Sequence, residues 1–327
     1  MLGSYWLCPT LTCNSLLSIM SIQWFPGHMH KARKEMAAVL PSVDVVIEVL
    51  DARLPYSSQN PMLNELRGEK PGLRVLAKAD LADQTLTQQW LPALSTDTID
   101  VLALTPSEPG GAKPVLQSLA ARFKPVPNQL KPRVAMVVGI PNVGKSTLIN
   151  ALAGRSVAKT GNEPAITKRQ QHVPISDHWS LRDTPGVLWP NVENANSGFR
   201  LAAAGSVRDT AMDNTEVCLT LIDYLLEYYP QLLVKRYGED GVEASDSTRT
   251  LELVGKQSGC LGARGHVDYD RAARIVLQDF RNGTLGPITL ESPTMQAAEE
   301  VAVAEQRAQK ALAKQQKQDA RKARRKK

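Results

Sequence analysis

Short aliphatic runs alternate with stretches of helical periodicity through about the first 190 residues of the chain. Buried strands are expected over residues 43–50, 73–76, 101–104 and 134–138, with two more on either side of 177–178. Helices are expected over residues 27–40, over a segment that ends near 123, and over 145–153. Strands that alternate with helices indicate an α/β fold with a mostly parallel sheet.

The pattern changes after residue 190. Three helical runs follow, over residues 215–228, 249–257 and 268–280. Little strand signal remains there, so a separate helical domain is expected over 191–292. Three prolines within 124–132 predict a linker. From residue 296 onward alanine, glutamine, lysine and arginine dominate, which is typical of either a solvated helix or a disordered arm.

The length of 327 residues and the apolar content of 43% suffice for two domains with hydrophobic cores. Aromatic residues make up only 5%, which favours the aliphatic core of a parallel sheet covered by helices. The net charge of +6 is concentrated at one end, because residues 305–327 hold ten Lys or Arg against Glu305 and Asp319, a balance of +8. The chain's +6 less the tail's +8 leaves −2 elsewhere, so the basicity belongs to the tail.

The cysteines are Cys8, Cys13, Cys218 and Cys260. They form no C-x-x-C pair and no metal-like spacing with histidine, which is typical of reduced thiols in a cytosolic protein. No apolar stretch reaches the roughly 20 residues that cross a bilayer, so no membrane association is expected. Residues 1–19 contain no Lys, Arg, Asp or Glu, which fits neither a signal peptide nor a transit peptide. Met20 is a candidate start, and residues 1–19 are interpreted as an upstream extension.

The strongest chemical signal is the sequence Gly139-Ile140-Pro141-Asn142-Val143-Gly144-Lys145-Ser146, which matches the phosphate-binding pattern G-x-x-x-x-G-K-S. A strand is expected before this P-loop and a helix after it, as the pattern requires. The glycines let the backbone curl so that N–H groups point at phosphate oxygens at a helix N-terminus. Lys145 would supply positive charge to the β- and γ-phosphates, and Ser146 would offer a hydroxyl to Mg²⁺.

The sequence Asp183-Thr184-Pro185-Gly186 follows about forty residues later, at the end of an expected strand. There the Asp183 carboxylate would hold Mg²⁺ through water, and the Gly186 N–H would bond the γ-phosphate. Between the two motifs, Thr167 lies in a polar loop and is the candidate to close on Mg²⁺ when the γ-phosphate is present. The expected Mg²⁺ ligands are therefore Ser146, Thr167 and Asp183.

Specificity for guanine is assigned to Lys78 and Asp80, which precede the P-loop. The Asp80 carboxylate can accept hydrogen bonds from N1–H and N2–H₂ of guanine, which adenine does not offer, and the Lys78 stem can cover the base. The usual pattern is N-K-x-D, but Ala77 stands in its first place, which predicts weaker nucleotide affinity with the guanine preference retained. Thr105-Pro106 follows the next strand at the spacing of a base-contacting loop. The expected nucleotide-binding residues are Lys78, Ala79, Asp80, Thr105, Pro106, Gly139, Asn142, Val143, Gly144, Lys145, Ser146, Thr147 and Gly186.

A base-reading segment that precedes the P-loop, with D-T-P-G last, resembles the circularly permuted GTPases. The further sequences that carry the resemblance are Gln23-Trp24-Phe25-Pro26-Gly27-His28-Met29, Asp51-Ala52-Arg53-Leu54-Pro55, residues 183–190 and Lys235-Arg236-Tyr237-Gly238. Together they resemble the YlqF/RbgA family of ribosome-biogenesis GTPases over about residues 20–294. The resemblance implies a permuted Ras-like P-loop GTPase domain over 20–190, a smaller helical RNA- or ribosome-contacting domain over 191–292 and a basic tail over 293–327.

The same resemblance implies a cytoplasmic GTPase that acts in late assembly of the large (50S) ribosomal subunit. It would bind rRNA or the precursor particle, which would stimulate hydrolysis, and we expect the chain to be monomeric off the ribosome. Ordinary switch GTPases have glutamine where this chain has Val187, whereas His28 falls where the family has a histidine proposed to take part in catalysis. The expected catalytic residues are therefore His28, Lys145 and Thr167. Ala165 replaces a glycine before Thr167, which would alter closure of that loop.

Asn142 matches an asparagine that helps bind K⁺ in related K⁺-stimulated GTPases, so K⁺ is a second expected cation. Such a cation could partly replace an arginine finger electrostatically. One alternative function stays open, that of an RNA-binding assembly factor in which nucleotide only stabilises a conformation, which Val187 and Ala77 favour. Another, GTPase-driven tRNA modification, would want a cofactor domain or a reactive C-terminal cysteine, but the chain ends in basic residues.

The basic tail suits rRNA, because each Lys or Arg that neutralises a phosphate releases counterions. Residues 305–327 contain no aromatic side chain, so contacts to the nucleic-acid backbone are expected instead of base stacking. A merely solubilising arm is the alternative interpretation of the same residues.

Overall fold

A computed structural model gives the fold of residues 26–124, 131–158, 171–184, 194–207, 212–262 and 265–325, with the backbone alone at 26–32, 171 and 319–325. Its centre is a six-stranded sheet in the order β3-β2-β1-β4-β6-β5. The strands are β1 Val45–Asp51, β2 Gly72–Ala77, β3 Ile99–Ala103, β4 Arg133–Val138, β5 Gln171–Pro174 and β6 Trp179–Asp183. All neighbouring pairs are parallel except β5 and β6. The expected mostly parallel α/β sheet is confirmed.

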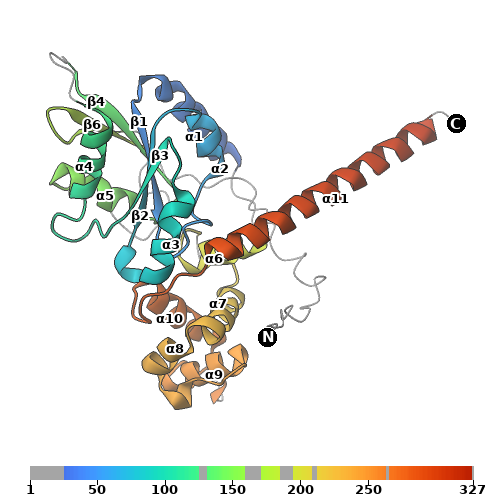
Figure 1. Cartoon of the computed structure of the whole chain (residues 1–327). Coiled ribbons are helices and arrows are strands. Elements are labelled where there is room, and N and C mark those ends of the chain that lie inside the picture. The colour runs from blue at the N-terminus through green and yellow to red at the C-terminus, as the bar shows by residue number, and fades with distance from the viewer. Residues whose placement is uncertain are drawn as a thin grey trace, which may run out of the picture.

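Helices cover both faces of this sheet (Figure 1). They are α1 Pro26–Val39, α2 Pro61–Arg67, α3 Gln84–Leu94, α4 Lys113–Arg122 and α5 Lys145–Ala153. Residues of β1 alternate between two apolar clusters: Ile47 packs with residues of α4 and α5, whereas Val46 packs with residues of α1 and α2. Trp90 of α3 forms a third cluster with Leu50. Burial of both strand faces explains why β1, β2 and β4 are mostly aliphatic.

The chain leaves the middle of the sheet in two directions. From β1 it proceeds outward to β2 and β3, and it then returns to β4, which lies on the other side of β1. In open parallel sheets, ligands bind outside the carboxyl ends of the strands at such a reversal of strand order. The sequence Asp51-Ala52-Arg53, the P-loop and the Lys78–Asp80 segment all follow strands at this edge.

Most of the remaining helices pack together beside the sheet (Figure 1). They are α6 Ala195–Ala203, α7 Asn214–Tyr228, α8 Pro230–Tyr237, α9 Ser247–Gln257 and α10 Tyr269–Arg281. Their apolar side chains, such as Leu225 and Val276, belong to the same buried cluster as Leu148 of α5. The helical part and the sheet therefore share one continuous core.

Residues 282–292, which we call the strap, lead from α10 back to the sheet. Their backbone N–H groups at Ile288 and Leu290 donate to the carbonyls of Leu81 and Arg53 at 3.0 and 2.8 Å. The strap leads into α11, Pro293–Arg325, which extends away from the body (Figure 1). Every side chain from 304 to 318 is exposed. Of the two expectations for the basic tail, a solvated helix is confirmed over these residues.

Four helices were not predicted from the sequence: α2, α3, α6 and α8. Helix α2 has seven residues and α8 eight, and each begins at a proline that is equally typical of a turn. Helix α3 contains Pro92 in its last turn, which interrupts the helical pattern. Helix α6 has only nine residues, and the seven that are buried include the polar Ser197 and Arg200, so burial there does not follow the apolar pattern of the sequence.

Candidate nucleotide site at the carboxyl edge of the sheet

The P-loop curls between β4 and α5. Gly139 has φ 149°, and a Cβ there would lie 2.5 Å from the Val49 carbonyl oxygen, so no side chain fits. Gly144 has φ 102° and is the N-cap of α5, a conformation that favours glycine. The first residues of α5, Lys145, Ser146 and Thr147, follow at once. The loop thus directs a helix N-terminus, a favourable place for an anion, toward the carboxyl edge of the sheet.

Lys145 is buried and folds back over this loop. Its Nζ donates to the Ile140 carbonyl at 2.8 Å. Burial lowers the pKa of Lys145 to about 8, although the nearby Asp183 carboxylate acts in the opposite direction. Asp183 ends β6 and is buried, and the Thr184 hydroxyl beside it donates to the Val137 carbonyl at 2.8 Å. The P-loop lysine and the D-T-P-G carboxylate are therefore close enough to interact electrostatically.

The upstream segment reaches the P-loop through Lys78. This residue has φ 59°, and its Nζ donates to the Asn142 carbonyl at 2.6 Å and to Asp51 Oδ2 at 2.8 Å. Asp80 is exposed, and its backbone N–H and carboxylate both bond the Thr105 hydroxyl at 3.2 Å. The two predicted base-contacting segments therefore touch each other, and one of them touches the phosphate loop.

Two positions singled out in the sequence, Ala77 and Asn142, each have a close neighbour in the fold. Ala77 is buried, and its Cβ would lie 3.5 Å from a Cβ built on Gly144, so β2 packs closely against the end of the P-loop. The side-chain amide of Asn142 donates to the Gly205 carbonyl at 2.7 Å, in the turn after α6. The P-loop thereby contacts the helical part directly.

A cavity of about 480 Å³ lies beside the loop that follows β3. It is lined by residues 106–113, Leu116, 150–152 and Gly154. Its size is within the usual range for small ligands. It borders α5 on the side of Thr105 and Pro106, whereas Asp80 does not line it. Of the residues assigned to the nucleotide only Pro106 lines this cavity, so it lies beside the expected base-contacting loop and is not the phosphate site.

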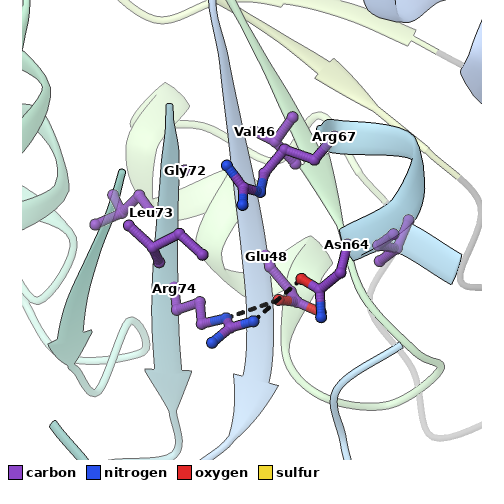
Figure 2. A pocket seen from close by; sticks show the side chains of 9 residues that line it. Val46, Glu48, Asn64, Arg67, Gly72, Leu73 and Arg74 are labelled. Atoms are coloured by element: carbon purple, nitrogen blue, oxygen red, sulfur yellow. Dashed lines mark hydrogen bonds and ion pairs between the residues drawn. The ribbon is translucent and has the colours of Figure 1, made fainter. Parts of the chain in front are cut away.

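A second cavity lies on the other face of the sheet, between β1, β2 and α2. Figure 2 shows Arg74 directed at Glu48 across it, with Asn64 alongside. Arg74 donates to Glu48 Oε2 and to Asn64 Oδ1, each at 3.1 Å. The free volume is about 10 Å³, room for no more than one water. This cavity is filled by a structural ion pair and excludes a nucleotide.

Some of the predicted site residues lie outside the part of the chain that the structure describes. Thr167, Gly186 and Val187 fall beyond the described residues, as does Ala165, and only the backbone of His28 is described, within α1. The structure brings together Lys78, Asn142, Lys145 and Asp183. The sequence motifs gave no role to Asp51 or Arg53, because Lys78 and the end of α10, which these two residues contact, are distant along the chain.

The residues present fit Mg²⁺ and a nucleotide together. Among the described residues no group of three or more His, Cys, Asp or Glu side chains could hold a metal. Mg²⁺ commonly uses one or two protein ligands plus substrate phosphates, and Ser146 and Asp183 at this edge match that chemistry. A curled glycine loop, a lysine folded across it and a helix N-terminus define a P-loop nucleotide-binding protein.

Comparisons with known proteins narrow this class. A family model described as "50S ribosome-binding GTPase" matches residues 134–251. The chain is 40% identical over 281 residues to Ribosome biogenesis GTPase A of Bacillus cereus, covering 84% of this chain and 95% of that protein. It is 35% identical over 296 residues to Mitochondrial ribosome-associated GTPase 1 of Mus musculus, covering 82% and 90%. The structure resembles GNP-bound YlqF from T. maritima with a TM-score of 0.58 and 25% identity, covering 80% and 98%.

The chain belongs to the ribosome biogenesis GTPase A family, also called YlqF/RbgA. It is a GTPase of ribosome biogenesis, and a guanosine nucleotide is its ligand. The resemblance drawn from the sequence motifs is confirmed. Within the described residues, no helix has the length and apolar character that a bilayer span requires.

Proposed function

We propose that this GTPase acts in late assembly of the large (50S) ribosomal subunit and binds rRNA or precursor particles in a nucleotide-dependent way. The description of the matching family model and the names of the relatives support a ribosomal partner. The main support for the nucleotide site is the hydrogen bond from Lys78 Nζ to the Asn142 carbonyl. This bond joins the upstream base-reading segment to the phosphate loop. We also propose a cytoplasmic location and a monomer off the ribosome.

In this proposal the GTPase part is circularly permuted. The segment assigned to guanine, Lys78-Ala79-Asp80, precedes the P-loop in the chain but lies beside it in space. The boundaries that we propose are 20–190 for the GTPase domain, 191–292 for the helical domain and 293–327 for the tail. The GTPase part and the helical part share one core, so a movement at the nucleotide site would shift the helices that pack against it.

The proposed nucleotide contacts combine described residues with Thr167 and Gly186, which lie outside the described residues. Backbone N–H groups of residues 139–147 and the Lys145 ammonium would bind the phosphates, with Gly186 at the γ-phosphate. Asp80 would accept from the guanine edge, flanked by the Lys78 stem and by Thr105 and Pro106. Mg²⁺ would be held by Ser146, Asp183 and Thr167, and would neutralise phosphate charge when bound.

Hydrolysis is assigned to Lys145, Thr167 and His28. K⁺ is a further proposed cation, with Asn142 as its ligand through the side-chain oxygen, since the amide nitrogen donates to Gly205. The second candidate function is a nucleotide-stabilised RNA-binding factor with little hydrolysis of its own. The sequence feature that favours it is Val187, which cannot orient water.

Helix α11 is the proposed rRNA arm. It is a single helix of 33 residues whose described side chains beyond residue 303 are exposed, and ten basic residues lie within 305–327. Cationic side chains on an exposed helix can neutralise phosphates without desolvation, which supports nucleic-acid backbone contact.

Cosedimentation with purified ribosomal subunits under GDP, GTP and a non-hydrolysable analogue tests the proposal. We expect enrichment on the large subunit or its precursor with the analogue; enrichment on the small subunit alone would overturn it. Single-turnover hydrolysis with and without large subunits separates the two candidate functions, because a pure binder would show no particle-dependent rate. Competition against labelled GDP tests the base: ATP that displaces it as well as GTP does would refute the guanine assignment.

A further inference from the structure

The motif Asp51-Ala52-Arg53 at the end of β1 has no part in the site as assigned so far. Both ionic side chains are almost fully buried, each 1% exposed. The Asp51 carboxylate accepts four hydrogen bonds: from the backbone N–H and Nε of Arg53 at 3.1 and 2.9 Å, from Arg53 Nη2 at 2.8 Å and from Lys78 Nζ at 2.8 Å. One buried anion thus holds two cations that point in different directions.

The first cation belongs to the nucleotide site. Lys78 Nζ spans Asp51 Oδ2 and the Asn142 carbonyl, which anchors the base-reading segment to the P-loop. Ala77, next to it, offers no polar side chain to brace the P-loop, where the usual motif has asparagine. Among the described residues Asp51 is the only carboxylate that forms an ion pair with Lys78. It therefore supplies bracing that the substituted motif lacks.

The second cation belongs to the helical part. Arg53 Nη1 donates to the carbonyls of Phe280 and Arg281, at 3.1 and 3.3 Å, and its guanidinium lies 4.8 Å from the centre of the Phe280 ring. These carbonyls end α10, and a cation at a helix C-terminus is favourable. The contact joins residues 227 and 228 positions apart in the chain, so it links the beginning of the fold to its end.

The contacts continue until they return to the P-loop. The Arg281 side chain donates to the carbonyls of Ala202 and Ala203 at 3.0 and 2.9 Å, at the end of α6. Gly205, two residues on, accepts from the Asn142 side chain at 2.7 Å. The result is a closed ring of polar contacts through the P-loop, Lys78, Asp51, Arg53, the end of α10 and the end of α6.

We propose that Asp51 is a positioning residue of the nucleotide site, which holds Lys78 against the P-loop and, through Arg53, ties that site to the ends of α10 and α6. The proposal rests on the nucleotide site assigned above. It makes nucleotide affinity depend on contacts that no nucleotide touches. Because linkage is reciprocal, a partner that shifts α10 or α6 would change nucleotide affinity by the same factor by which nucleotide changes affinity for that partner.

The main test is the rate of release of a fluorescent GDP from the full-length chain. Arg53→Gln removes the link to α10 and one partner of Asp51, and we expect about tenfold faster release, the effect of losing one charge-assisted hydrogen-bond network. Asp51→Asn should act in the same direction and more strongly, because Lys78 loses its ionic partner. Arg53→Lys should restore part of the affinity, since it keeps the charge but not the fork.

The chain offers a closely matched control in Arg74. It is also a buried arginine that pairs with a carboxylate, Glu48, and donates to the last carbonyl of a helix, Leu94 of α3. It lies on the other sheet face, away from the P-loop. Arg74→Gln should lower the melting temperature about as much as Arg53→Gln without changing GDP release. Equal changes in release for the two variants would overturn the proposal.

Arg281→Gln provides a second variant in case Arg53→Gln does not fold, because Arg281 is only partly buried. It should also speed release, whereas a wild-type rate in a folded Arg281 variant would contradict the ring. Failure of the guanine assignment is separately visible in the wild-type chain as equal displacement by ATP. In that case the release ratios between variants, measured with whichever nucleotide binds, still decide the role of Asp51.

Discussion

Arg200 on α6 and Glu299 on α11 form a two-bond ion pair, with Nη1 2.9 Å from Oε2 and Nη2 2.7 Å from Oε1. Glu299 also accepts from the side-chain amides of Asn194, the N-cap of α6, and Asn196. All four hydrogen bonds come from the first described helix after β6, the strand that ends at Asp183. The root of the basic helix is therefore held by the element that follows the D-T-P-G motif.

Removing the bonds to Glu299 should let α11 adopt a wider range of orientations relative to the sheet. In a chain with Cys8→Ser and Cys13→Ser, spin labels at Leu312→Cys and Asp97→Cys should give a broader distance distribution when Glu299→Ala is added. Leu312 lies on the exposed part of α11, and Cys218 and Cys260 are buried. Glu300→Ala is the matched control, because Glu300 accepts only from Gln296 of the same helix among the described bonds. An unchanged distribution in the Glu299 variant would show that α11 is directed by other contacts.

Lys145→Met should stabilise the nucleotide-free chain at pH 7 while abolishing nucleotide binding. Burial lowers the pKa of Lys145 to about 8, below the ordinary value of about 10.4. The gain should be about 2 kcal/mol in urea unfolding, from about 1.4 kcal/mol per pKa unit less about 1 kcal/mol for the bond to Ile140. A destabilised Met variant would contradict the burial argument. Lys310→Met, on the exposed part of α11, should change neither property.

The stability of the nucleotide-free wild type should rise with pH between about pH 8 and pH 10 relative to Lys145→Met. In that window the unfolded chain binds more protons at this lysine than the folded chain, so unfolding becomes less favourable as pH increases. Below pH 8 the cost of the buried charge is fully present. Parallel urea titrations of both proteins at pH 7, 8, 9 and 10 measure the difference, and a constant difference would show that the lysine does not titrate there.

Asp80→Asn should exchange guanine for xanthine preference. An amide at this position donates to the xanthine C2 carbonyl but cannot accept both guanine donors, so GDP affinity should fall by at least about a hundredfold. Titration with labelled GDP and competition by xanthosine diphosphate measure the change. Asp97→Asn is the control, because that side chain is exposed and remote from the carboxyl edge. Unaltered GDP affinity in the Asp80 variant would remove Asp80 from the base site.

Ala77→Asn should slow GDP release several-fold, because it adds a hydrogen-bonding side chain where β2 packs against Gly144. Stopped-flow release of labelled GDP gives the rate. Ala77→Ser separates polarity from reach, since its hydroxyl is shorter. Faster release in the Asn variant would mean that this buried position has no room for the amide and that the chain is adapted to alanine.

Deleting residues 305–327 should flatten the salt dependence of particle binding. Each lost phosphate contact should reduce the slope of log affinity against log salt by about 0.7–0.9. A chain in which the tail arginines and lysines are replaced by glutamine keeps the helix length and should behave like the deletion. An unchanged slope in both would leave the tail as a solubilising arm.

Strands β1, β2 and β4 could be predicted well because each is a mostly aliphatic run that ends in a motif, as in the case of β4 and Gly139. The helices that begin or end at proline could not, because Pro61 and Pro230 suit turns as well as helix starts. At the site, Lys145 and Asp80 were identifiable from short local patterns. The bond between Asp51 and Lys78 was not, since the two residues are 27 positions apart and no local pattern encodes that distance.

Sequence distance also explains why the contact of Asn142 was not predicted. Its resemblance to an asparagine of K⁺-stimulated GTPases predicted a cation ligand, and no local signal pointed to Gly205, whose carbonyl is 63 residues further along. Contacts between the sheet and the helical part depend on how the whole chain folds back, and composition and periodicity do not carry that information.

The strap also bears on when the protein becomes competent during its synthesis. The backbone N–H groups of Tyr56 and Ser57 donate to the buried Glu291 carboxylate, and the Trp90 indole donates to the Glu291 carbonyl. These three donors emerge early from the translating ribosome, whereas their acceptor is made some two hundred residues later. A nascent chain therefore lacks the protein acceptor of these three donors until residue 291 has been made. A truncated GTPase half would not be expected to work alone.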